Sequence, residues 1–115
     1  MQRDILFLLK ENFEDGPGQP YYCPQCAEIN GVLAYFPELR HRLDVRYVDF
    51  PRPRQAIIEL IGEASQGCPV LVLGEKPEAE LMELTSGNLN GRYFISGPGE
   101  IARYWARVHN ISRPH

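Results

Sequence analysis

Apolar runs along the chain predict four strands. Continuous apolar runs within Asp4–Leu9 and Val70–Leu73 are typical of strands that are buried on both faces of a sheet. Val45–Phe50 and Arg92–Ser96 complete the set of expected strands. Gly, Pro and polar residues separate these segments, which is typical of turns and loops.

Three apolar stripes at helical spacing predict the main helices. The first helix begins near Cys23, because Pro24 suits the first helical position, and Pro37 kinks or ends it. The second helix follows over 51–64, and the last begins at Pro98. The residues of the three stripes, in chain order, are Ile29, Val32, Leu33 and Phe36; Ile57, Leu60, Ile61 and Ala64; and Ile101, Tyr104, Trp105 and Val108.

The order of these elements predicts the class of fold. Alternation of strand and helix implies parallel pairing with right-handed crossovers, and two strands before the last helix suggest a final hairpin pair. Residues 78–84 indicate a helical turn, and residues 86–91 have the composition of a loop. We therefore expect a single α/β domain over residues 1–115, with a four-stranded mixed sheet flanked by helices.

Composition and charge narrow the classes of function. The 115 residues are 43% hydrophobic and 23% charged, as in ordinary globular domains. A formal net charge of -3 gives no electrostatic reason to expect nucleic acid or a membrane surface as partner. The apolar run Ile5–Leu9 is too short for a membrane span of roughly 20 residues or a signal core of about 7–15. We therefore expect a cytoplasmic location.

The three cysteines carry the clearest chemical indication. An odd number of cysteines in a chain that is expected to be cytoplasmic points to catalysis or metal binding rather than to a disulfide scaffold. The motif Cys23-Pro24-Gln25-Cys26 follows a strand and opens a helix, which is the context of a redox dithiol. At the helix start, free backbone N–H groups and the helix dipole favour a thiolate on Cys23. Cys26, one turn further on, can resolve a mixed disulfide on Cys23.

A second short motif lies forty-odd residues further along the chain. Cys68-Pro69 directly precedes the apolar strand Val70–Leu73. A proline at the head of a central strand can hold a cis bond, which exposes the backbone of the preceding residue.

Together these two motifs resemble the thioredoxin superfamily, and glutaredoxins are the closest subgroup in style because they also place Pro second in the motif. The resemblance implies a thioredoxin-like fold, with Cys23 as the nucleophile, Cys26 as the resolving thiol and Pro69 as a cis-proline beside the site. The sequence differs at Gln25, where glutaredoxins have an aromatic residue, and at Cys68, where Val or Thr is usual. The whole chain also resembles a family of small, uncharacterised bacterial thioredoxin-like proteins.

The resemblance also implies a reaction and its partners. We expect thiol–disulfide exchange without a resident cofactor, with a disulfide-bearing protein or glutathione as partner. Tyr22, Pro24, Gln25, Cys68 and Pro69 are then the expected substrate-binding residues. The sequence gives no indication of an oligomeric state.

Two other interpretations remain open. In one, Cys23, Cys26 and Cys68 hold zinc or an iron–sulfur cluster, with a histidine as fourth ligand. In the other, the domain is a non-catalytic interaction module. For Arg52, Arg54 and Gln55, at the start of the second helix, the sequence favours a solvated helix start over recognition of a substrate carboxylate.

Overall fold

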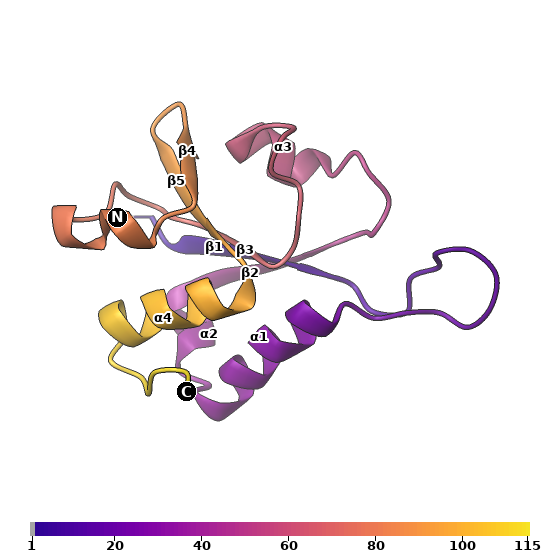
Figure 1. Cartoon of the computed structure of the whole chain (residues 1–115), viewed down its shortest axis with the longest axis horizontal. Helices are drawn as coiled ribbons and strands as arrows, with labels where there is room; N and C mark the ends of the chain where they lie inside the picture. The colour runs from indigo at the N-terminus through magenta and orange to yellow at the C-terminus, as the bar shows by residue number, and fades with distance from the viewer. Residues whose placement is uncertain (1) are drawn as a thin grey trace.

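A computed structural model describes residues 2–115, which form a mixed α/β fold around a five-stranded sheet (Figure 1). The strands are β1 (Asp4–Leu9), β2 (Leu43–Val48), β3 (Val70–Val72), β4 (Gly87–Leu89) and β5 (Arg92–Ser96), in the spatial order β2-β1-β3-β5-β4. The helices are α1 (Pro24–Tyr35), α2 (Leu39–Arg42), α3 (Gln55–Ile61) and α4 (Pro98–Val108), with a short 3₁₀ helix η1 at Ala79–Leu84.

The sheet has five strands where the sequence predicts four. The additional strand is β4, which pairs antiparallel with β5 within the segment expected to be a loop. Asn90 and Gly91 join the two strands and both have positive φ, 51° and 81°. The strand was missed because it is three residues long, polar and at the sheet edge, so it has no apolar alternation to detect.

Strand pairing follows the expectation only in part. β1 and β2 are parallel, with α1 in the crossover between them. β3, however, is antiparallel to β1, with Phe7 opposite Val70 and Ile5 opposite Val72. Residues 62–69 bring the chain back to the carboxyl end of β1, so β3 enters the sheet from that end. The antiparallel pairing therefore places the start of β3 beside the end of β1.

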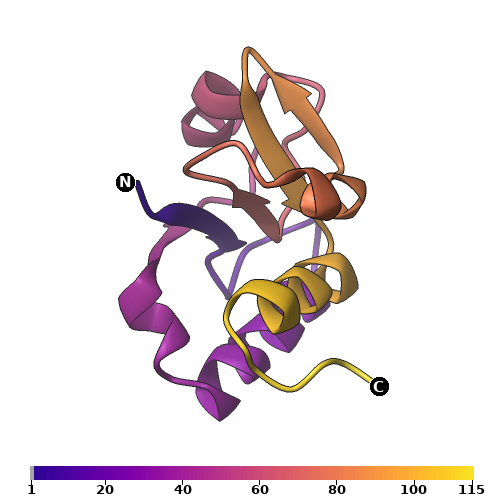
Figure 2. The ribbon, with the colours of Figure 1, turned by 90° about the vertical axis from the view of Figure 1, so that its left-hand side faces the viewer.

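Both faces of the sheet are covered, as Figures 1 and 2 show, with α1 and α4 on one side and α3 on the other. In β1, Leu6 and Leu8 belong to the core cluster with α1 and α4, whereas Phe7 belongs to the cluster with α3. This alternation follows from the two-residue period of a strand. Two expected core positions are wrong. Ala64 lies beyond the end of α3 and is exposed, and Val108, the last residue of α4, is 37% exposed.

The segment between β1 and α1 extends away from the rest of the molecule (Figure 1). Its two arms are joined by backbone hydrogen bonds between Phe13 and Tyr21, of 3.0 and 2.8 Å. The Phe13 ring also stacks on the Phe50 ring, with centroids 4.2 Å apart. This segment leads directly into Cys23 at the start of α1.

Candidate functional site

Cys23 is the N-cap residue of α1. Its backbone is extended (φ -81°, ψ 112°), and Pro24 occupies the first turn, where its missing N–H leaves no hydrogen bond unmade. The Cys23 Sγ accepts a hydrogen bond from the backbone N–H of Cys26 at 3.1 Å. The sulfur therefore takes the place that a Ser or Asp oxygen usually takes at a helix N-terminus. The residue is half-buried.

Cys26 has a very different environment although it is only three residues away. It is 3% exposed and packs in the core cluster with Ile29 and Leu33 of the same helix face. Its Sγ accepts a hydrogen bond from the backbone N–H of Leu9 at 3.5 Å, at the end of β1. Burial, and next the hydrogen bond with Cys23, raise the pKa of Cys26 to about 12. Cys26 is therefore held as a neutral thiol while Cys23 is reduced.

Cys68 and Pro69 lie beside the motif, and the peptide bond between them is cis, as expected. The Cys23 thiol points at the backbone carbonyl oxygen of Cys68, at 4.0 Å. Cys68 is half-buried and packs against both core clusters, and Pro69 is buried. Burial raises the pKa of Cys68 to about 11, and the positive charge of Arg54 acts in the opposite direction.

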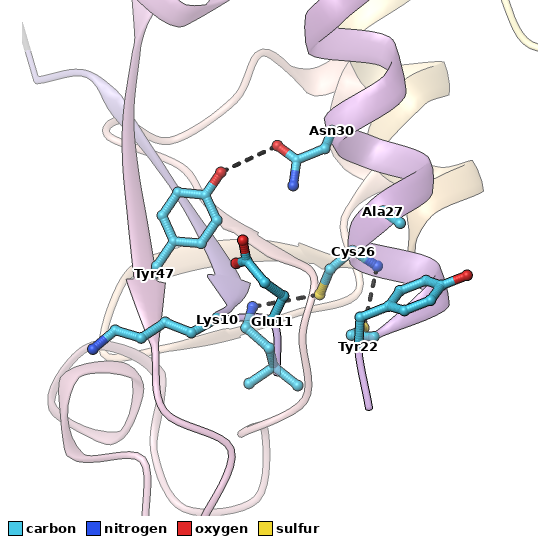
Figure 3. A pocket seen from close by; sticks show the side chains of 9 residues that line it. Lys10, Glu11, Tyr22, Cys26, Ala27, Asn30 and Tyr47 are labelled. Atoms are coloured by element: carbon cyan, nitrogen blue, oxygen red, sulfur yellow. Dashed lines mark hydrogen bonds between the residues drawn. The ribbon is translucent and has the colours of Figure 1, made fainter. Parts of the chain in front are cut away.

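A pocket of about 540 Å³ opens beside the two motif cysteines (Figure 3). Figure 3 shows Tyr47 on β2 and Asn30 on α1 facing one another, with the Cys26 sulfur pointing from α1 toward the end of β1. The Tyr47 hydroxyl donates to the Asn30 Oδ1 at 3.2 Å. The nine lining residues are Leu9, Lys10, Glu11, Tyr22, Cys23, Cys26, Ala27, Asn30 and Tyr47.

The expected site residues are only partly brought together by the fold. Cys23, Cys26 and Tyr22 line this pocket, and Tyr22 is 62% exposed at its rim. Pro24 and Gln25 are exposed on the first turn of α1 and do not line it. The sequence did not identify the pocket residues Lys10, Asn30 and Tyr47, because they come from three separate segments of no recognisable motif.

The expectation of a solvated side chain is wrong for Arg54. It is 7% exposed rather than solvated. Its guanidinium donates to the Phe50 carbonyl from Nη2 at 2.6 Å and from Nε at 3.0 Å, and to the Gln66 carbonyl from Nη1 at 2.9 Å. It also lies 5.5 Å from the centroid of the Phe50 ring. Arg54 thus ties the segment before α3 to the segment that leads into Cys68.

Among residues 2–115, no group of three or more His, Cys, Asp or Glu side chains is arranged to hold a metal ion. Within the same residues, every helix is too short or too polar to cross a membrane.

Fold and site together define a mixed α/β domain with a Cys-x-x-Cys motif at a helix N-terminus. The model of a protein family described as "Protein of unknown function (DUF3088)" matches residues 3–113, so the chain belongs to this family. Comparison with curated proteins and with solved structures gives no match.

Proposed function

We propose that this chain is a thioredoxin-like thiol–disulfide oxidoreductase in which Cys23 is the nucleophile and Cys26 the resolving thiol. The observation that carries the proposal is the Cys23 sulfur at the N-cap of α1, where it accepts the Cys26 N–H at 3.1 Å. A backbone N–H and the positive end of a helix stabilise a thiolate at that position. Cys23 is also the half-buried member of the pair, so a substrate disulfide can reach it.

The arrangement of strands supports the fold assignment. The unit β1-α1-β2 is parallel, and it is followed by antiparallel β3 and β5 and then by α4. Apart from the edge strand β4, this is the four-stranded mixed sheet flanked by helices that the resemblance to thioredoxins implies. The position of Pro69 directly before β3, next to the Cys68 carbonyl that Cys23 contacts, also agrees with that resemblance.

The reaction has two exchange steps. The Cys23 thiolate attacks one sulfur of a substrate disulfide, which forms a mixed disulfide and releases the other sulfur as a thiolate. Cys23 then carries no charge, so its electrostatic effect on the pKa of Cys26 is lost, while burial still raises that pKa. Cys26 loses its proton to water, attacks Cys23 Sγ and displaces the second substrate thiolate. The substrate disulfide is reduced to two thiols, and Cys23 and Cys26 are oxidised to a disulfide.

We propose a disulfide-bearing protein or glutathione disulfide as the substrate, and a reducing compartment such as the cytoplasm as the location. A cellular dithiol or glutathione would then return the pair to the reduced state.

Intact mass spectrometry tests the function. We expect the reduced wild-type protein to lose the mass of two hydrogens under a mild disulfide oxidant, with Cys23 and Cys26 joined in the peptide map. The Cys68→Ser variant should do the same, and Cys23→Ser should lose its reductase activity toward both a protein disulfide and glutathione disulfide. Zinc or an iron–sulfur cluster in the purified protein, removed by a chelator, would contradict the proposal, as would a Cys23→Ser variant with full activity.

A further inference from the structure

Cys68 is the one cysteine that the proposed reaction leaves unused, and the fold places it beside the nucleophile. Antiparallel pairing of β3 with β1 brings the start of β3 to the end of β1, where α1 begins. The Cys23 Sγ lies 4.0 Å from the Cys68 backbone carbonyl oxygen, and the two thiols are near enough for the charge of Cys23 to raise the pKa of Cys68. Cys23 therefore has two neighbouring thiols, one on its own helix and one on the segment before β3.

The charge around Cys68 differs from that around Cys26. Arg54 is more than nine-tenths buried, and all three of its side-chain hydrogen bonds go to uncharged carbonyl oxygens. Among residues 2–115, no carboxylate forms an ion pair with it. A buried cation without a carboxylate is costly unless another anion compensates for it. The positive charge of Arg54 therefore favours the Cys68 thiolate whenever that thiol loses its proton.

The state of Cys23 controls how easily that anion forms. Arg54 and, more weakly, Arg52 lower the pKa of Cys68, whereas the charge of Cys23 raises it. A mixed disulfide on Cys23 removes that repulsion and leaves both arginines in place. Cys68 thus becomes more acidic at the stage when a second thiol is needed.

We propose that Cys68 is a second resolving thiol, which attacks a mixed disulfide on Cys23 and closes a Cys23–Cys68 disulfide. The proposal rests on the proposed role of Cys23 as nucleophile. In this step the Cys68 proton passes to water, and the new bond joins the sulfurs of Cys68 and Cys23. The bond between Cys23 and the substrate sulfur breaks, and the substrate leaves as a thiolate. Arg54 is a positioning residue, since it holds the segment before Cys68 and carries the nearby positive charge.

The Cys26→Ser variant isolates this step. We expect the reduced variant, treated with one equivalent of dipyridyl disulfide, to release two pyridinethiones per chain and to lose the mass of two hydrogens. Peptide mapping should then show Cys23 joined to Cys68. The double variant Cys26→Ser/Cys68→Ser is the matched control, which should release one pyridinethione and keep the pyridyl adduct. A Cys26→Ser protein that also keeps the adduct would overturn the proposal.

Two further measurements keep the outcome unambiguous. Wild type and Cys68→Ser must close the Cys23–Cys26 disulfide with the same reagent. If these two proteins also keep the pyridyl adduct, the proposed function itself is wrong. Cys26→Ala serves as a second variant if a serine at this buried position prevents folding, because a buried thiol behaves as a small apolar group.

The role of Arg54 has its own readout in the Cys26→Ser background. With Arg54→Gln, the pH dependence of the second pyridinethione release should move to higher pH, because the charge that favours the Cys68 thiolate is gone. With Arg54→Lys the charge remains, so the pH profile should stay near that of the parent even if stability falls. An unchanged profile in Arg54→Gln would contradict the positioning role.

Discussion

Cys23, Cys26 and Cys68 lie close together but differ in exposure, in hydrogen bonding and in the charges nearby. Cys23 caps a helix and is half-buried, whereas Cys26 is 3% exposed in the core. Cys68 is half-buried like Cys23, and it is the cysteine whose pKa the charges of Arg54 and Arg52 lower. Because thiolates rather than thiols react, these environments assign different roles to chemically identical side chains.

These differences predict an order of alkylation in the reduced protein. A brief pulse of iodoacetamide at pH 8 should label Cys23 first, because burial raises the pKa of Cys68 to about 11 and that of Cys26 to about 12, which keeps both as neutral thiols at that pH. Raising the pH to 10 should increase labelling of Cys68 before Cys26. Peptide mass spectrometry measures each site, and the urea-unfolded chain, in which all three sites should react alike, is the control. Labelling of Cys26 ahead of Cys23 would contradict the assignment.

The sequence could predict the residue chemistry of the motif but not its surroundings. A Cys-x-x-Cys after a strand indicates a helix start, and Cys23 is indeed the cap of α1. Arg54 could not be placed, because nothing in the sequence shows that the Phe50 and Gln66 carbonyls converge on its guanidinium. Arg54 is buried because folding brings together the two segments that carry these carbonyls.

Among the elements, those with strong apolar periodicity were predicted well. β1 and β5 have the predicted bounds, and α4 begins at Pro98 as expected. β4 was missed, although Asn90-Gly91 is a sequence typical of a two-residue hairpin turn in which both residues have positive φ. The antiparallel direction of β3 was missed because a strand–helix–strand pattern favours a parallel crossover, and the path of residues 62–69 overrides it.

One glycine at the end of β3 is required by close packing between elements. The backbone N–H of Gly74 donates to Asp4 Oδ1 at 2.8 Å, which joins the end of β3 to the start of β1. A Cβ at Gly74 would overlap the backbone carbonyl of Gln2. Gly74→Ala should therefore destabilise the protein by about 1–3 kcal/mol, a typical cost of overpacking. Urea unfolding followed by the fluorescence of Trp105, the only tryptophan, measures this change.

Gly31 provides a control, because the same substitution by alanine is expected to raise the stability there rather than lower it. It lies within α1, is exposed, and a Cβ there would meet no described atom within 4 Å. Gly31→Ala should stabilise the protein by roughly 0.5–1 kcal/mol, because alanine loses less conformational freedom in a helix. Equal effects of the two substitutions would contradict the close approach at Gly74.

In the whole molecule, the candidate site lies where both core clusters meet the end of the sheet. Cys26 belongs to the cluster under α1 and α4, whereas Cys68 packs against that cluster and also against the one under α3. The motif cysteines are thus held by the core rather than by a mobile loop, which favours a fixed geometry for exchange. The long segment before Cys23 extends away from this core (Figure 1). Sequence patterns identify the two faces of each strand, but not which loops converge at one end of the sheet.

Stability of the whole molecule should fall at alkaline pH, because buried Cys26 and Tyr104 and half-buried Cys68 hold their protons more tightly in the folded state. Burial raises the pKa of Cys26 to about 12 and that of Cys68 to about 11, both from an ordinary value of 9.0. It raises the pKa of Tyr104 to about 12 from 10.0. In the unfolded chain these groups ionise first, so the folded state is disfavoured as pH rises above about 9.

The contribution of these three groups to the free energy of unfolding should therefore be constant below about pH 8. The free energy of unfolding should then decrease steadily from about pH 9 to 11. Urea titrations of the reduced protein, followed by Trp105 fluorescence at several pH values, measure this slope. Tyr104→Phe removes one of the three groups without removing its ring, so its slope between pH 9 and 11 should be shallower than that of wild type. A stability that stays constant or rises over this range would mean that the three groups ionise in the folded protein as readily as in the unfolded chain. The site would then be more open to water than the buried Cys26 and half-buried Cys68 of this structure indicate.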